Sequence, residues 1–133
     1  MPFDTPILIV DESSSMRTAV RQILKEAGYK EVILSRDGAE GLKVLKGSMN
    51  PCSQKIGLIL CEWAMPNMTG LEMLQEVRKD SQLKTIPFVM VTNEKRTERI
   101  LDAVKKGATD FIFKPFPAAL LVEKVKKHLL PSS

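Results

Sequence analysis

Residues 7–17 read ILIVDESSSMR, and this stretch decides the fold. Four apolar residues, three of them β-branched, run without alternation from Ile7 to Val10. An uninterrupted run of this kind is typical of a strand that is buried on both faces of a parallel sheet. Two acids follow, and then apolar residues recur at helical spacing as far as Gly28: Met16, Ala19, Val20, Ile23, Leu24 and Ala27. The stretch therefore predicts one strand–helix unit with polar residues at its junction.

The same alternation recurs along the rest of the chain. Further apolar runs suited to buried strands lie at Val32–Leu34, Ile56–Leu60, Phe88–Thr92 and Phe111–Phe113. Capping-box patterns at residues 37–40 and 69–72 predict the starts of the second and third helices. Strand–helix alternation of this kind predicts an α/β fold with right-handed crossovers and an open parallel sheet covered by helices on both faces.

The last two helices are predicted from their apolar spacing. Ile100, Leu101 and Val104 would form the inner face of a fourth helix that ends at Gly107. Pro117 suits the first position of a fifth helix, with three leucine or valine side chains directed inward: Leu121, Val125 and Leu129.

Length and composition exclude several classes of protein. The 133 residues fit one domain, and 44% hydrophobic with 27% charged residues is typical of a globular protein. We expect no membrane span and no signal peptide, because no apolar run is long enough and acids come too early. Cys52 and Cys61 lack disulfide or metal spacing, which predicts reduced thiols and a cytoplasmic location. No nucleic-acid-binding motif is present, and only 5% of residues are aromatic, so we expect no nucleic-acid binding.

Polar residues stand where four of the predicted strands end. These pairs are Asp11-Glu12, Cys61-Glu62, Thr92-Asn93 and Lys114-Pro115. The carboxyl ends of parallel strands meet at one edge of a sheet, so these side chains are expected to converge there. Crowded carboxylates call for a cation such as Mg²⁺, while a lysine and a hydroxyl can hold an anion. The combination predicts a site for a phosphoryl group.

Four stretches carry a resemblance to a known family: ILIVDESSSMR, LCEWAMPNMTGLEML, PFVMVTNE and GATDFIFKPF. With them the sequence resembles CheY-like receiver domains of two-component response regulators, from Ile7 to about Leu130. The resemblance implies a flavodoxin-like (βα)5 three-layer sandwich with a parallel five-stranded sheet in the order 2-1-3-4-5. It also implies that residues 1–133 form a single receiver domain with no output domain, which signals and is not an enzyme.

The family's functional positions can be matched to this chain. The resemblance implies that Mg²⁺ would be bound by Asp11, Glu12, the acceptor side chain and the backbone carbonyl of Ala64. It implies that Lys114 contacts the phosphoryl group, that Thr92 is the switching hydroxyl and that Phe111 is the aromatic residue that turns inward on activation.

The acceptor position departs from the family pattern. The family has an aspartate four residues before the proline of the Met-Pro pair, and this chain has Glu62 there. Cys61 cannot substitute, because its side chain points to the other face of the strand. Asn93 is a second departure, since the family has a small residue at this position.

We expect these departures to affect the chemistry of the acceptor. One extra methylene moves the carboxylate about 1.5 Å further into the site, where it could reach Lys114 and Thr92 and imitate part of a phosphoryl charge. In-line attack on a phosphodonor tolerates little displacement, so we expect phosphorylation of Glu62 to be slow or absent. Mg²⁺ binding should survive in weakened form.

The net charge of +4 comes from the last third of the chain. Residues 1–94 hold 11 basic and 12 acidic side chains, whereas residues 95–133 hold 9 and 4. The resemblance places this excess on the face formed by the fourth helix, fifth strand and fifth helix, where family members meet partners. We expect a protein partner there, such as a histidine kinase, a phosphotransferase or a downstream target, with a monomer or weak dimer as the oligomeric state. The candidate contact residues are Lys105, Lys106, Lys126 and Lys127.

Other functions remain open from the sequence alone. The chain could be a conventional phosphorylatable receiver whose acceptor aspartate was changed to glutamate. A flavodoxin-like carrier is disfavoured, because Asp11 and Glu12 would repel a bound phosphate and no glycine exposes backbone amides there. A small phosphotransferase enzyme is disfavoured, because Glu62-Trp63-Ala64 offers no second acid beside a nucleophile.

Overall fold

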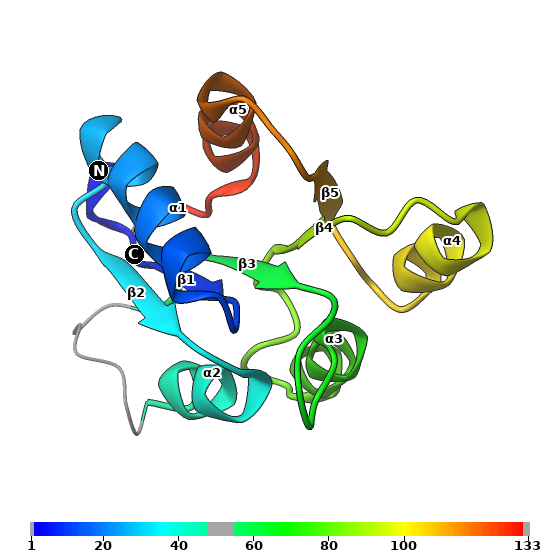
Figure 1. Cartoon of the computed structure of the whole chain (residues 1–133). Coiled ribbons are helices and arrows are strands. Elements are labelled where there is room, and N and C mark those ends of the chain that lie inside the picture. The colour runs from blue at the N-terminus through cyan, green and yellow to red at the C-terminus, as the bar shows by residue number, and fades with distance from the viewer. Residues whose placement is uncertain (1, 48–54, 132–133) are drawn as a thin grey trace.

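Five strands and five helices alternate in the computed structural model, which describes residues 2–47 and 55–131 (Figure 1). All strand pairs are parallel, and the sheet order is β2-β1-β3-β4-β5, as the resemblance implies. A 3-10 turn at Pro2–Asp4 precedes the first strand. The remaining elements are β1 Ile7–Val10, α1 Ser14–Glu26, β2 Val32–Ser35, α2 Gly38–Leu45, β3 Leu58–Glu62, α3 Gly70–Lys79, β4 Phe88–Thr92, α4 Thr97–Lys105, β5 Asp110–Phe113 and α5 Ala118–His128. Cys52 lies outside the described residues.

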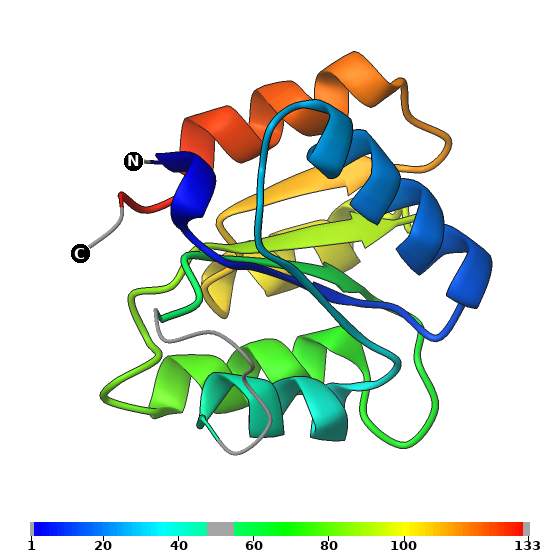
Figure 2. The same cartoon turned by 90° about the vertical axis from the view of Figure 1, so that its left-hand side faces the viewer.

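The sheet is sandwiched between two layers of helices. Helices α1 and α5 cover one face, and α2, α3 and α4 cover the other (Figures 1 and 2). Alternate residues of each strand supply the two cores, so that Ile7 and Ile9 pack toward α1 and α5 while Leu8 and Val10 pack toward α2 and α3. The uninterrupted apolar runs of the sequence follow from this burial on both faces.

The boundaries of β3 differ from those predicted. The apolar run starts at Ile56, but the strand is Leu58–Glu62. Glu62 is therefore a residue of the strand itself, paired in register with Val91 of β4. This pairing fixes the backbone of the acceptor position within the sheet.

Helix starts follow the predicted capping residues, with one difference. Thr69 and Glu72 form the full capping box at the start of α3. At α2, Asp37 accepts a hydrogen bond from the Glu40 amide, but the Glu40 carboxylate accepts from the amide of Arg36 rather than that of Asp37. The box predicted at residues 37–40 is thus half formed. None of the helices in the described part of the chain is long and apolar enough to cross a membrane.

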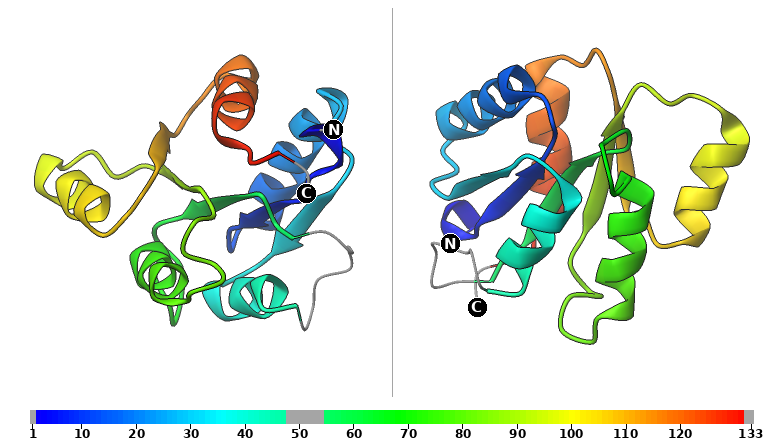
Figure 3. Two further views of the ribbon diagram at one scale, coloured as in Figure 1. Left: turned by 180° about the vertical axis from the view of Figure 1, so that it is seen from behind. Right: turned by 60° about the horizontal axis from the view of Figure 1, so that its bottom comes forward.

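The predicted inner face of α4 is wrong. Leu101 and Val104 are 54% and 51% exposed, whereas Ala103 is fully buried and Ile100 is half-buried. Figures 1 and 3 show α4 beyond the β5 edge of the sheet, farther out than α3. A small residue faces the sheet there, and the larger side chains are left on the outer surface.

Helix α5 packs as predicted and is also held by charge. Leu121 and Val125 are fully buried, while Pro117 is the N-cap rather than the first helical residue. Asp110, the first residue of β5, accepts hydrogen bonds from Lys124 Nζ at 2.8 Å and pairs with His128 Nε2 at 2.7 Å. These contacts tie the end of α5 to the edge strand.

Arg78 joins the α3–β4 loop to the α4–β5 loop, at the opposite end of the sheet from the polar strand ends. Its guanidinium donates to the carbonyls of Gly107 at 3.0 Å, Ile86 at 2.7 Å and Lys84 at 3.1 Å. Gly107 has φ +107°, and a Cβ atom there would lie 2.9 Å from Arg78 Nε, so glycine is required for both reasons.

We predict that Arg78→Ala lowers the free energy of unfolding by about 2 kcal/mol, because three carbonyl groups lose a charged donor. Urea unfolding followed by circular dichroism measures this change. The neighbouring Lys79→Ala variant is the control, since it removes only an exposed ion pair with Glu76 and should change stability by less than about 0.5 kcal/mol. Equal effects of the two substitutions would contradict the role given to Arg78.

Candidate functional site

Three of the predicted site residues meet at the carboxyl edge of the sheet. Asp11 follows β1, Glu62 ends β3 and Lys114 follows β5. Lys114 Nζ lies 2.5 Å from Glu62 Oε1 and 3.4 Å from Asp11 Oδ2. Both carboxylates are buried, and the Lys114 side chain is 14% exposed. The convergence expected from the strand ends is thus present for these three side chains.

The two remaining carboxylate oxygens are held by backbone amides. Asp11 Oδ1 accepts from the Ser13 amide at 2.9 Å, and Glu62 Oε2 accepts from the Trp63 amide at 2.6 Å. In addition, Arg17 Nη1 donates to the Asp11 carbonyl at 2.6 Å. Every carboxylate oxygen of the pair therefore has a donor from the protein.

The charges of the acids control the protonation of Lys114. Burial lowers the pKa of its ammonium, but the hydrogen bond that it donates to Glu62 and the charges of Glu62 and Asp11 outweigh burial, so the pKa is raised above its usual value. Lys114 is consequently a full cation at neutral pH.

Cys61 takes no part in this cluster. Its side chain packs in the core on the α2–α3 side of the sheet, as expected for the residue before Glu62 in a strand. Burial raises the pKa of the thiol well above its usual value, and the charges of Glu62 and Asp11 raise it further. A protonated, fully buried thiol is not a nucleophile.

The loop from Trp63 to Thr69 folds back on the end of β3. Asn67 adopts a left-handed backbone conformation with φ 68°, and the Gly70 amide donates to the Trp63 carbonyl at 2.8 Å. A Cβ atom on Gly70 would lie 2.3 Å from the Glu62 carbonyl oxygen, which no side chain permits. The asparagine and glycine of the Met-Pro-Asn-Met-Thr-Gly run therefore have structural reasons for their positions.

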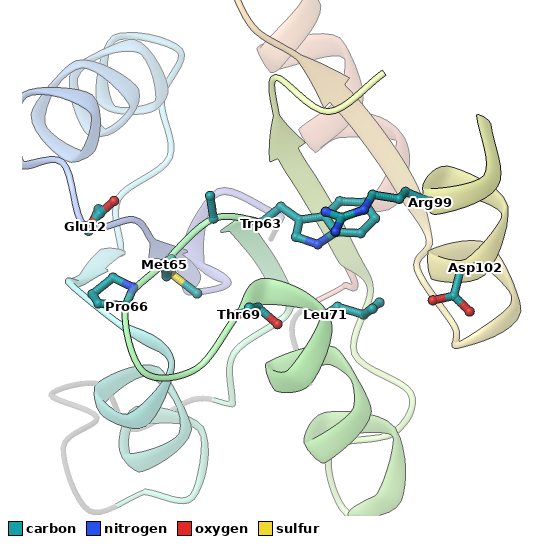
Figure 4. A pocket seen from close by; sticks show the side chains of 9 residues that line it. Glu12, Trp63, Met65, Pro66, Thr69, Leu71, Arg99 and Asp102 are labelled. Atoms are coloured by element: carbon teal, nitrogen blue, oxygen red, sulfur yellow. The ribbon is translucent and has the colours of Figure 1, made fainter. Parts of the chain in front are cut away.

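Glu12 and Ala64 take no part in the ion pairs of the cluster. Both are exposed and line a cavity of about 680 Å³ beside Trp63, Arg99 and Asp102 (Figure 4). Glu12 is on one side of this cavity, and α4 carries the two charged residues on the other. Within residues 2–47 and 55–131, no three His, Cys, Asp or Glu side chains gather as a metal ligand set.

Thr92 and Asn93 lie on the far side of Glu62. Thr92 is buried, and its hydroxyl accepts a hydrogen bond from the Glu94 amide at 3.0 Å. Together with Glu62 and Trp63 these residues line a smaller cavity of about 190 Å³. The carboxylate of Glu62 reaches Lys114 as expected, but its described hydrogen bonds do not include the expected one with Thr92.

Phe111 is half-buried rather than turned to solvent. It packs against the α2–α3 core and stacks on Phe113, with ring centroids 6.0 Å apart and planes at 7°. Phe113 is 39% exposed and forms the solvent-facing side of this stack.

Sequence reasoning missed three donors of the site. The amides of Ser13 and Trp63 carry no side-chain signal, because any residue at those positions supplies the same N–H group. Arg17 had a signal, namely a cation in the first helical turn after the acid pair, and a search for counter-charges around Asp11 would have found it.

The comparisons with known proteins agree on one family. The family model described as the response regulator receiver domain matches residues 7–126. The chain is 36% identical to the chemotaxis protein CheY of Pseudomonas aeruginosa over 121 residues, which are 91% of this chain and 93% of that protein. It is also 36% identical to CheY-3 of Vibrio cholerae, covering 91% and 88% of the two chains. The crystal structure of Vibrio cholerae chemotaxis protein CheY4 at low pH is similar with a TM-score of 0.83 and 35% identity, covering 95% and 99% of the two chains.

We predict that Lys114→Met lowers the free energy of unfolding by about 3 kcal/mol at neutral pH, because it leaves two buried carboxylates without a counter-charge. Because the pKa of Lys114 is higher in the folded protein than in the unfolded chain, where it is about 10.4, the charged lysine stabilises the fold at pH values below about 10.4. This contribution is lost as the pH rises through the pKa of Lys114 in the folded protein. The difference between the two proteins should therefore be constant from pH 7 to about pH 10 and shrink above that. Urea unfolding at a series of pH values measures it.

Lys124→Met is the matched control, since it also removes a lysine that pairs with an aspartate but one that is more exposed. Its effect should stay near 1 kcal/mol or less. A Lys114→Met penalty that shrank already between pH 7 and pH 9 would contradict the assignment.

Proposed function

The chain belongs to the response regulator receiver domain family, and we propose that it is an atypical receiver that signals by protein contact without phosphorylation of Glu62. Domains of this CheY type act in two-component signal transduction, and receiver domains are signalling modules. The absence of any catalytic turnover by this chain is part of the proposal.

The observation that carries the proposal is the engagement of the Glu62 carboxylate. One oxygen is paired with Lys114 and the other accepts from the Trp63 amide. An acceptor must present a free oxygen in line with the phosphodonor, and displacements of about 1 Å slow such reactions strongly. Both the extra methylene and the two hydrogen bonds work against that geometry.

Glu62 imitates only part of a phosphorylated aspartate. Its carboxylate pairs with Lys114, the residue that the family uses to contact the phosphoryl group, but it carries one negative charge where a phosphoryl group carries between one and two. The Thr92 hydroxyl accepts from the Glu94 amide and is not drawn toward Glu62. We therefore propose one fixed signalling state rather than two interconverting ones.

Receiver domains typically bind Mg²⁺ at the acceptor site. The proposed ligands in this chain are Asp11, Glu12, Glu62 and the Ala64 carbonyl, and as placed they do not fit the ion. Lys114 pairs with both buried acids, the exposed Glu12 lines the adjacent cavity, and Ala64 lines both that cavity and the smaller one beside Glu62. We propose that Mg²⁺ binding is weakened accordingly, and no step of the proposed function depends on the metal.

A second candidate is a conventional receiver whose acceptor was changed from aspartate to glutamate. The observation that favours it is the otherwise complete set of Asp11, Thr92 and Lys114 around Glu62. This candidate predicts that restoring aspartate restores phosphorylation.

We predict that incubation with acetyl phosphate and Mg²⁺ leaves the intact mass of the protein unchanged, because Glu62 cannot attack in line. The Glu62→Asp variant should gain the mass of one phosphoryl group, which would support a site that is otherwise intact. The matched control is Glu62→Gln, which has the same length and no nucleophilic carboxylate. A base-labile phosphoryl adduct on Glu62 of the unaltered protein would refute the proposed function.

We propose that the partner binds the surface formed by α4, β5 and α5. Leu101, Val104 and Phe113 are its exposed apolar residues. Four lysines belong to the C-terminal ends of the same two helices: Lys105 and the C-cap Lys106 at α4, and Lys126 and Lys127 in α5. Lys106 is partly neutralised by Asp102 at 3.0 Å. Exposed apolar residues and lysines on the same elements suit a partner that presents both apolar and acidic side chains, such as a histidine kinase, a phosphotransferase or a downstream target.

The remaining features of the proposal concern where and how the chain acts. We propose a cytoplasmic protein that is a monomer or weak dimer and binds neither nucleic acid nor membranes. The sequence features given above support these points: reduced thiols, no nucleic-acid-binding motif and few aromatic residues.

We predict that replacing Lys105, Lys106, Lys126 and Lys127 by glutamate weakens partner binding at least about tenfold, because opposite charges steer and stabilise such contacts. Tagged protein immobilised in native lysate, with quantitative mass spectrometry of retained proteins, measures the loss. Lys43→Glu and Lys46→Glu, two exposed lysines on α2 and at its C-cap, away from α4, β5 and α5 (Figure 1), form the control and should leave binding unchanged. Undiminished binding by the fourfold variant would contradict the assigned surface.

A further inference from the structure

We infer that the Lys114 ammonium is the resident cation of this site and competes directly with Mg²⁺ for the carboxylates of Asp11 and Glu62. The inference rests on the proposed function, because it concerns the same site and explains why a metal is not needed there. It begins from the burial of the two acids, which need a counter-charge to remain ionised in the protein interior.

The first step concerns the partners of the four carboxylate oxygens of Asp11 and Glu62. Asp11 Oδ2 and Glu62 Oε1 contact Lys114, while the other two oxygens accept from the amides of Ser13 and Trp63. Mg²⁺ requires near-octahedral oxygen coordination and gives up its waters reluctantly. Lys114 and the metal would therefore compete for Asp11 Oδ2 and Glu62 Oε1, while each of the other two oxygens already accepts one hydrogen bond from a backbone amide.

The second step is the fate of a displaced ammonium group. The space beyond Lys114 is a cavity of about 430 Å³ lined mainly by apolar side chains of α1 and by Pro115 and Phe116. Its lining includes Asn93 but no aspartate or glutamate. An ammonium group moved into that space would lose its ionic partners, so displacement by the metal is opposed.

The third step is the local charge. The two carboxylates are offset by Lys114 and by Arg17, whose guanidinium lies 2.6 Å from the Asp11 carbonyl oxygen. Glu12, the further acid that the family pattern assigns to the metal, is exposed on the neighbouring cavity. The excess negative charge that attracts a divalent cation is therefore absent from the cluster as arranged.

The fourth step is the length of the acceptor side chain. Glu62 places Oε1 2.5 Å from Lys114 Nζ. An aspartate at this position ends about 1.5 Å short of that point, which lengthens the contact and makes the carboxylate oxygen available to a metal. The single methylene thus decides which cation the site holds.

The experiment is a Mg²⁺ titration without any phosphodonor, followed by the fluorescence of Trp63 and by thermal melting in Mg²⁺ or EDTA. Trp63 is adjacent to Glu62 and is the only tryptophan. We expect the unaltered protein to melt at the same temperature in both solutions, and Glu62→Asp and Lys114→Met to bind Mg²⁺ at least about tenfold more tightly. Lys124→Met, whose lysine pairs with Asp110 away from the site, should behave like the unaltered protein.

Equal Mg²⁺ affinity in the unaltered protein and in Glu62→Asp would overturn the inference. If Lys114→Met does not fold, the comparison with Glu62→Asp decides alone. The outcome is separate from that of the proposed function: a phosphoryl adduct on Glu62 refutes that function whatever the metal affinity, and tight Mg²⁺ binding by the unaltered protein refutes the resident cation even if no adduct forms.

Discussion

One ammonium group holds together the ends of three strands. In the sheet order β2-β1-β3-β4-β5, Lys114 follows the edge strand β5, and its Glu62 partner lies two strands away on β3. Neighbouring strands are about 4.8 Å apart, so the contact spans about 10 Å across the end of β4. Only a long side chain covers that distance. The two buried acids, Asp11 and Glu62, both depend on this contact for their counter-charge.

The fold could be predicted largely from the sequence because burial on both faces leaves a clear pattern. The predicted strands are continuous apolar runs, and the predicted capping residues Asp37 and Thr69 accept hydrogen bonds at the starts of their helices. The start of β3 was misplaced, since Ile56 is buried without belonging to the strand. The inner face of α4 was wrong for a related reason. Hydrophobic periodicity identifies an apolar stripe but not which neighbour covers it, and here Ala103 alone is fully buried.

The site was predictable where it consists of side chains at strand ends. The acid after β1, the acid that ends β3 and the lysine after β5 were brought together by parallel topology alone. Other contacts were not predictable, because they depend on backbone groups or on side-chain direction. The contacts of the two carboxylates with the amides of Ser13 and Trp63 depend on backbone groups. The outward position of Glu12 depends on the direction of its side chain. The position of Thr92 depends on both, because its hydroxyl accepts a hydrogen bond from the backbone amide of Glu94.

Helix α4 buries little of its surface against the sheet, and this has a consequence for the motion of the helix. The helix has one fully buried side chain, Ala103, and its N-cap residue Arg96 makes no side-chain capping hydrogen bond. Helices with so little buried apolar surface open locally at a low free energy, and their amides exchange with solvent hydrogen before those of the core strands. A protein that docks on Leu101 and Val104 would bury the very residues whose exposure leaves this helix loosely held. Binding and local ordering would then be one event, and amide protection in α4 would report the occupancy of the surface.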